Sequence, residues 1–62
     1  MFNYRIDWID TATGAHCVDW LTRESAIREV KNDILGEIYS VTEIIDEEGN
    51  ESENLLEIFR NL

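Results

Sequence analysis

Residues 2–21 have the sequence FNYRIDWIDTATGAHCVDWL, and the pattern within this stretch decides the predicted fold. Apolar and polar residues alternate from Phe2 to Trp8, which is typical of a β-strand with one buried face. Asp10 to Gly14 follow, where an aspartate can hydrogen-bond within a turn and a glycine can adopt a positive φ. The stretch therefore predicts a β-hairpin.

The apolar side chains favour one register for this hairpin. If the residue numbers of facing partners sum to 24, all the large apolar residues lie on one face, and the pairs are Trp8 with His16, Ile6 with Val18, and Tyr4 with Trp20. A shift by one residue would divide this set between the two faces. We therefore expect this register, with both tryptophans in the core.

The middle of the chain predicts a helix and a third strand. Thr22 is a favourable N-cap, and the spacing of apolar residues predicts an amphipathic helix from Thr22 to Leu35, with the buried positions Ala26, Ile27, Val30 and Ile34. Gly36 would end this helix as a C-terminal glycine cap. Residues 38–45 are rich in β-branched side chains and predict a strand that is covered on both faces.

The last part of the chain predicts a loop and a second helix. Residues 46–50 have the composition of a turn, and the helical spacing that follows predicts buried positions at Leu55, Ile58, Phe59 and Leu62. Ser52 or Asn54 would cap this helix. As a strand, the segment would place the charged Glu57 on the same side as the apolar Leu55 and Phe59, so the helix is favoured.

These elements predict a single α+β domain over residues 1–62. It would consist of a small three-stranded antiparallel sheet with one packed helix and a C-terminal helix, in the order ββαβα. A chain of this size buries only about 60% of the surface that its unfolded form exposes. The core must therefore be small, and association into a homodimer would add stability.

The few reactive side chains argue against an enzyme and against a metal or cofactor site. His16 and Cys17 are adjacent and point to opposite sides of a strand, which does not suit a nucleophile and its base. A single Cys and a single His cannot form a disulfide or a zinc site. An EF-hand calcium loop needs an acid or amide five places before its glycine, whereas the residue five places before Gly49 is the apolar Ile44.

Negative charge is concentrated in the second half of the chain. The net charge is −9, and the sequence from residue 37 onward contains eight carboxylates and a single basic residue, Arg60. Such a chain repels nucleic acids and anionic membranes, so we expect neither direct nucleic-acid binding nor membrane binding, and a basic protein as partner. The candidate partner-binding residues are Glu37, Glu43, Asp46, Glu47, Glu48, Glu51, Glu53 and Glu57.

The spacing of these residues allows imitation of a nucleic acid. Carboxylates two apart on a strand lie about 6.6 Å apart and those three or four apart on a helix about 5 to 6 Å, whereas duplex DNA carries one charge per ~1.7 Å of axis. In size, charge and the segment from Glu43 to Glu57, the chain resembles the small acidic inhibitors that phages encode, the anti-CRISPR proteins and other DNA mimics. This resemblance implies a non-catalytic inhibitor that binds the nucleic-acid-binding surface of another protein in the host cytoplasm.

Other interpretations fit the same residues. The acidic segment could be a solvated loop that only keeps the protein soluble. An acidic antitoxin that neutralises a basic toxin would have a similar sequence. A structural or assembly module would instead dimerise through apolar residues such as Ile9, Leu56 or Phe59. The chain has no basic segment followed by an apolar run, and no apolar stretch of about 20 residues, so we expect a soluble, cytoplasmic protein.

Overall fold

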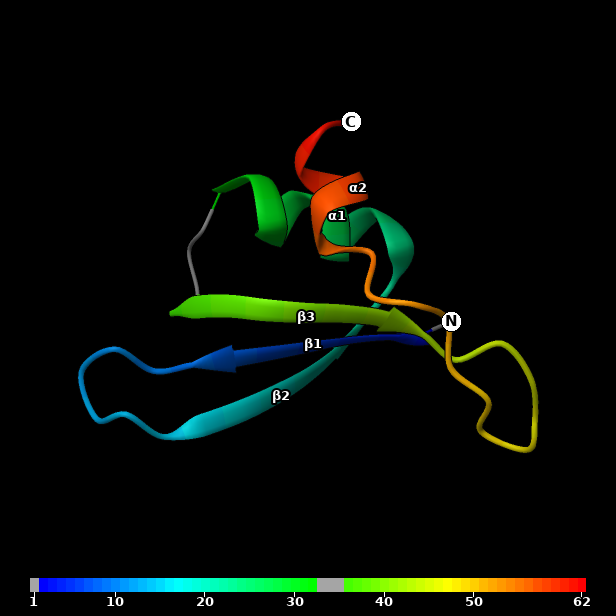
Figure 1. The fold of residues 1–62 in the computed structure, drawn as a ribbon, viewed down its shortest axis with the longest axis horizontal. Helices are drawn as coiled ribbons and strands as arrows, with labels where there is room; N and C mark the ends of the chain where they lie inside the picture. Colours follow the sequence, from blue (N-terminus) through cyan, green and yellow to red (C-terminus); the bar gives the residue numbers. More distant parts are fainter. Residues whose placement is uncertain (1, 33–35) are drawn as a thin grey trace.

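The structure is a computed structural model that describes residues 2–32 and 36–62. The elements are β1 (Tyr4–Ile9), β2 (His16–Leu21), α1 (Arg23–Asn32), β3 (Glu37–Glu43) and α2 (Leu56–Arg60). The strands form an antiparallel sheet in the order β2-β1-β3, and both helices lie on one face of it (Figure 1). The predicted α+β fold and its ββαβα order are confirmed. The expected extension of the first helix to Leu35, with Ile34 buried, lies outside the described residues.

The turn between β1 and β2 sets a hairpin register that differs by one residue from the prediction. The Asp10 amide donates to the Ala15 carbonyl at 2.9 Å, the Gly14 amide donates to the Asp10 carbonyl at 2.7 Å, and Gly14 has a φ of 76°. Closing the turn at Asp10 and Ala15 fixes all later pairs, so Ile6 faces Asp19 and not Val18. Turn geometry therefore overrides the preference for placing all apolar side chains on one face.

The corrected register exposes one of the two tryptophans. Facing residues of an antiparallel pair share a face, so Tyr4 and Ile6 of β1 lie beside Leu21 and Asp19 of β2 under the helices. Trp20 lies on the opposite face and is 50% exposed, so its predicted core position is wrong. Trp8 is half-buried on the helix side, where its indole N–H donates to the Asp19 carboxylate at 3.0 Å.

Helix α1 begins as predicted but is followed by a glycine with a different role. The Ser25 amide donates to the Thr22 hydroxyl at 3.2 Å, which confirms Thr22 as the N-cap. The φ of Gly36 is outside the left-handed region, so the glycine cap predicted there is wrong. A Cβ at Gly36 would instead lie 1.9 Å from the carbonyl oxygen of Ile9. Gly36 is required because the two backbones approach closely.

Strand β3 contains an irregularity that changes the direction of its side chains. The pairing with β1 shifts between Asp7 and Trp8, so Ile38 faces Trp8 although Ser40 faces Asp7. Ile38 and Val41 therefore both lie in the core despite an odd separation. Tyr39 is 44% exposed on the face without helices. The prediction that this strand is covered on both faces is therefore wrong, and the strand ends at Glu43 and not at residue 45.

Helix α2 is shorter than predicted and buries a different stripe. It has five residues, and the buried ones are Leu56 and Phe59, whereas Ile58 and Leu62 are 49% and 54% exposed. Leu56 and Phe59 therefore belong to the core and are not available for dimerisation. Leu55 occupies the N-cap position and makes no side-chain cap bond, but the amide of Leu56, the first helical residue, donates to the Asn54 side chain at 3.0 Å. Asn54 therefore caps the start of the helix as one of the two predicted candidates, and Ser52 does not.

The segment before α2 covers the outer edge of β3. The Asn54 side chain accepts from the Val41 amide at 3.1 Å and donates to the Tyr39 carbonyl at 3.1 Å. The Leu55 amide donates to the Val41 carbonyl at 2.7 Å. These bonds satisfy one edge of the sheet, so β2 forms the other edge.

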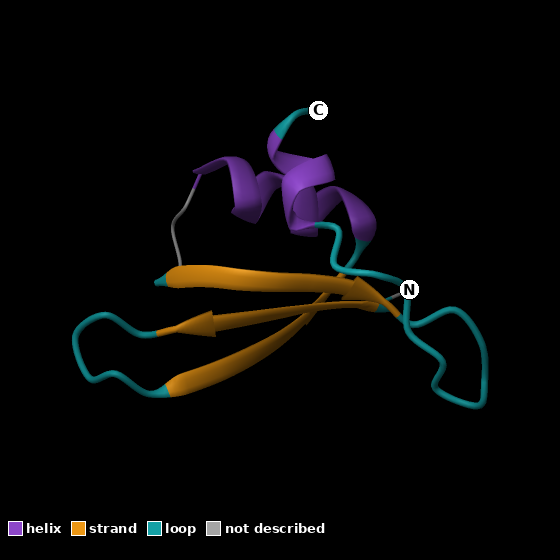
Figure 2. Cartoon of the chain, in the orientation of Figure 1, coloured by secondary structure: helices purple, strands orange, loops and turns teal. Residues whose placement is uncertain are grey.

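No helix in residues 2–32 and 36–62 has the length and apolar character needed to cross a bilayer (Figure 2).

Candidate functional site

Six of the eight predicted binding residues lie on one structural unit, which we call the acidic arm (residues 43–53). The arm folds back on itself as an antiparallel loop: Ile44 pairs with Glu51, and the Ile45 amide donates to the Asn50 carbonyl at 2.8 Å. The Ser52 amide donates to the Glu43 carbonyl at 2.8 Å, which closes its base. The loop projects beyond the end of the sheet (Figure 1).

Asp46 holds the tip of the acidic arm together. Its carboxylate accepts the Asn50 side-chain amide at 2.7 Å, the Asn50 backbone amide at 3.2 Å and the Glu48 amide at 3.0 Å. These bonds, with the Asn50 side chain contributing most, lower the pKa of Asp46. Gly49 completes the turn with a φ of 84°. Asp46 is therefore a structural residue of the arm as well as a negative charge.

Two further carboxylates fix the arm to the sheet. The Glu51 carboxylate forms an ion pair with Arg5 at 2.5 Å, and Arg5 also pairs with Asp7 at 3.1 Å. The Glu43 carboxylate accepts from the Asn3 side chain at 3.5 Å. Burial of the Tyr4 hydroxyl, followed by the charge of Glu43, raises the pKa of Tyr4. Glu43 and Glu51 therefore already have partners within the protein.

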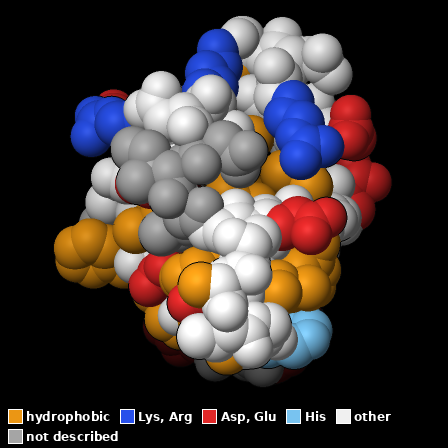
Figure 3. Space-filling view, turned by 90° about the vertical axis from the view of Figure 1, so that its left-hand side faces the viewer, with side chains coloured by type: hydrophobic (Ala, Val, Ile, Leu, Met, Phe, Trp, Pro, Cys, Tyr) orange, Lys and Arg blue, Asp and Glu red, His pale blue; other side chains and the backbone are white. Residues whose placement is uncertain are grey.

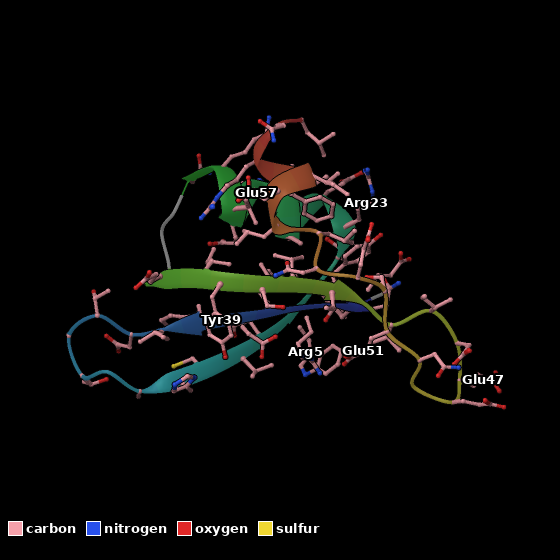
Figure 4. All side chains as sticks on the ribbon, in the orientation of Figure 1. Arg5, Arg23, Tyr39, Glu47, Glu51 and Glu57 are labelled. Carbon is pink, nitrogen blue, oxygen red and sulfur yellow. The ribbon has the colours of Figure 1, made fainter. Side chains whose placement is uncertain are left out.

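Glu47, Glu48 and Glu53 have exposed carboxylates without a cationic partner. All three residues are exposed, and no ion pair within residues 2–32 and 36–62 involves any of them. Glu47 lies at the outer tip of the arm, away from the body of the molecule (Figure 4). We call these three residues the open carboxylates. They can meet an external cation without breaking a contact inside the protein.

The two remaining predicted residues lie elsewhere. Glu37 begins β3, six residues from Glu43, which corresponds to about 20 Å along a strand. Glu57 is on α2, where its carboxylate forms an ion pair with Arg60 at 3.1 Å. In Figure 4 it lies among the helices, whereas Arg5 and Glu51 lie on the other side of the sheet. The eight predicted residues therefore do not form one continuous surface, because Glu37 and Glu57 lie apart from the arm.

Positive and negative charges nearly balance in the helices, whereas negative charge dominates the sheet and the arm. The two helices carry four of the five basic residues, Arg23, Arg28, Lys31 and Arg60, against the three acids Glu24, Glu29 and Glu57. Outside the helices, the described residues include ten carboxylates and one arginine, Arg5. At the end opposite the arm, Lys and Arg side chains lie over the helices and hydrophobic side chains lie below them (Figure 3). A basic surface is therefore attracted to the sheet and the arm.

The two reactive side chains of β2, His16 and Cys17, each lie near another polar group of the protein. A His16 ring nitrogen lies 3.3 Å from the Tyr39 hydroxyl, and the Cys17 thiol points to the Ala15 carbonyl at 3.9 Å. Within residues 2–32 and 36–62, no three His, Cys, Asp or Glu side chains are grouped so that they could hold a metal ion. The arrangement in the arm can bind cations on a partner's surface by charge.

The sequence interpretation missed the exposed side chains on the face without helices. These are Val18, Trp20 and Tyr39, each between 44% and 50% exposed. A signal was present in β2, because apolar residues occupy both of its alternating sets of positions, Cys17 and Leu21 on one and Val18 and Trp20 on the other.

No protein-family model matches the chain, and neither a curated protein nor a solved structure is significantly similar to it.

Proposed function

We propose that this protein is a non-catalytic inhibitor that binds a basic, nucleic-acid-binding surface of a partner protein through the acidic arm. The observation that carries this proposal is the set of open carboxylates Glu47, Glu48 and Glu53, which are exposed and have no ion-pair partner in the described chain. A groove that binds nucleic acid displays clustered Lys and Arg side chains. The arm offers such a groove a dense set of negative charges.

The rest of the arm prepares these charges for binding. Asp46 organises the tip, and the Arg5–Glu51 ion pair fixes the returning segment to the sheet. A charged surface that is already ordered loses less conformational entropy on binding than a flexible acidic tail. The contrast between the nearly neutral helices and the acidic sheet and arm also favours one orientation of approach, since a basic surface is attracted to the acidic side. An acidic antitoxin would use the same interaction with a basic toxin.

The test compares two triple variants that remove the same amount of charge. Glu47→Gln/Glu48→Gln/Glu53→Gln removes the open carboxylates, and Glu24→Gln/Glu37→Gln/Glu57→Gln removes three exposed carboxylates outside the arm. Each immobilised protein is used to capture partners from a lysate of the host at low and at high salt, and the captured protein is then purified and titrated. Charge-led binding should weaken steeply as salt rises.

We expect the arm variant to bind weakly and with a flatter salt dependence, while the control variant binds almost as well as the wild type. Both variants should fold, because the substituted side chains of the arm make no ion pair and a surface pair such as Glu57 with Arg60 contributes about 0 to 1 kcal/mol. Equal weakening by both variants would show that total charge, and not the arm, attracts the partner. Unchanged binding by both would reject the proposal.

A further inference from the structure

The sheet has one face without helices, and we call it the open face. Arg5 of β1, Val18 and Trp20 of β2, and Tyr39 of β3 lie on it. Val18 and Trp20 are each 50% exposed, and Tyr39 is 44% exposed. A tryptophan and a tyrosine that are half accessible offer large apolar area together with rings that attract cations.

Strand β2 forms an edge of the sheet next to these side chains. The sheet order is β2-β1-β3, and the β3 edge is bonded to the segment Ser52–Leu55. Within the described residues, β2 pairs with β1 alone, so alternate backbone N–H and C=O groups of its six residues point outward. An extended segment of another protein can add to such an edge through main-chain hydrogen bonds.

The side chains of β2 specify what such a segment should look like. Val18 and Trp20 point to the open face, and Asp19 points to the helix side, where it accepts from the Trp8 indole N–H at 3.0 Å. Asp19 forms no ion pair within residues 2–32 and 36–62. An added strand places alternate side chains on the two faces. One set would cover Val18 and Trp20, and the other would reach Asp19.

The net charge of the protein favours a basic partner over a second copy of this chain as the occupant of the β2 edge. Each copy carries a net charge of −9, so pairing two copies along β2 brings like charges together. The acidic arm also reaches the open face, because Glu51 is paired with Arg5, which lies opposite Trp20. In Figure 4, the labelled Arg5 and Glu51 lie together below the strands, with Glu47 farther out on the arm. An occupant of this face therefore meets carboxylates at its end.

We propose that β2 and the open face bind an extended protein segment in which basic and apolar residues alternate. The segment adds to β2 as a fourth strand, with its apolar side chains on Val18 and Trp20 and its basic side chains directed to Asp19 on the helix side. The end of the segment lies next to the acidic arm. This inference rests on the proposed function, since it specifies the kind of basic partner. It adds a shape and sequence requirement that attraction by charge alone does not have.

The test uses two synthetic octapeptides with blocked ends and the same composition. One alternates lysine and valine, and the other has the valines and the lysines in separate blocks. Affinity is measured by calorimetry, and hydrogen exchange of the β2 amides reports on main-chain bonding. The protein variants are Trp20→Ala and Val18→Lys, which change exposed side chains, and the open-carboxylate triple variant described above.

We expect the alternating peptide to bind at least about tenfold more tightly than the block peptide and to slow exchange in β2. Trp20→Ala should weaken it by roughly thirtyfold, the loss typical of a central aromatic contact, and Val18→Lys should also weaken it by placing a charge against the apolar side chains of the peptide. Trp20→Phe should recover most of the affinity, which would exclude unfolding as the cause.

Two other outcomes would overturn the inference. Equal binding of both peptides, insensitive to Trp20→Ala but weakened by the triple variant, would show attraction by the arm alone and would leave the proposed function intact. A dimer in sedimentation that Val18→Lys dissociates, with no peptide bound, would show that a second copy occupies the edge. By contrast, the peptide could bind along β2 while the triple variant binds the natural partner as tightly as the wild type does. That result would reject the proposed function.

Discussion

The close approach of Gly36 to Ile9 predicts that any side chain at Gly36 destabilises the domain. In Gly36→Ala the new Cβ would lie 1.9 Å from the Ile9 carbonyl oxygen and 2.8 Å from the Ile9 carbonyl carbon. An ordinary contact is about 3.5 Å, so the backbones must separate where Ile9 pairs with Glu37. We expect a loss near the upper end of the 1 to 3 kcal/mol typical of overpacking, or about 3 kcal/mol.

This loss is large for so small a domain. A chain of this length has a total stability of about 3 to 9 kcal/mol, and ~3 kcal/mol corresponds to a fall in Tm of roughly 12 to 24 °C. Circular dichroism during heating measures it. The discriminating variant is Gly36→Asn: asparagine tolerates the left-handed conformation, so a glycine cap would accept it, whereas a steric contact rejects it as strongly as alanine.

Gly14 provides the matched control for Gly36. Gly14 has a φ of +76°, and a Cβ there would meet nothing within 4 Å. Gly14→Asn should therefore change Tm little, while Gly14→Ala should cost about 1 to 2 kcal/mol. If Gly36→Asn melts at nearly the wild-type temperature, the close approach of Gly36 and Ile9 is refuted, and with it the observed pairing at this end of β1 and β3.

Three further changes test the core, the arm and the region around Tyr4. Ile6→Ala should cost about 2 to 5 kcal/mol in denaturant titration because Ile6 is fully buried, whereas Ile58→Ala should cost less than about 1 kcal/mol. The raised pKa of Tyr4 contributes stability that is fully present below about pH 10 and is lost as the pH rises through the raised value, so Tyr4→Phe should flatten the alkaline loss of stability. The lowered pKa of Asp46 contributes stability that is present above about pH 4 and is lost as the pH falls through the lowered value. Asp46→Asn should flatten that acidic loss, and unchanged pH profiles in either variant would refute the corresponding contact.

Local sequence signals were sufficient for the elements that depend on nearby residues. The alternation before Trp8, the turn residues from Asp10 to Gly14 and the Thr22 cap each predicted an element that the structure contains. The concentration of carboxylates after residue 42 also predicted that most of the candidate residues lie close together, and the structure places six of them on the acidic arm. These features depend on interactions within a few residues, so composition and spacing reveal them.

The errors concern interactions between distant segments. The register depends on how the Asp10–Ala15 turn closes, and the buried pair Ile38 and Val41 depends on an irregularity in the pairing of β3 with β1. The role of Gly36 depends on a contact with Ile9, far away in the sequence. Periodicity assumes regular strands and cannot report such contacts. For the same reason, the sequence could not separate the open carboxylates from Glu51, which has a partner.

The proposed function requires that the acidic arm and a nucleic acid compete for one basic surface. The direct measurement is a titration of the captured partner with fluorescently labelled nucleic acid in the presence of increasing amounts of this protein. We predict that the protein displaces the nucleic acid, that the open-carboxylate triple variant displaces it only at much higher concentration, and that the Glu24→Gln/Glu37→Gln/Glu57→Gln control behaves like the wild type. A stable ternary complex, in which the partner holds the protein and the nucleic acid together and neither displaces the other, would contradict the claim.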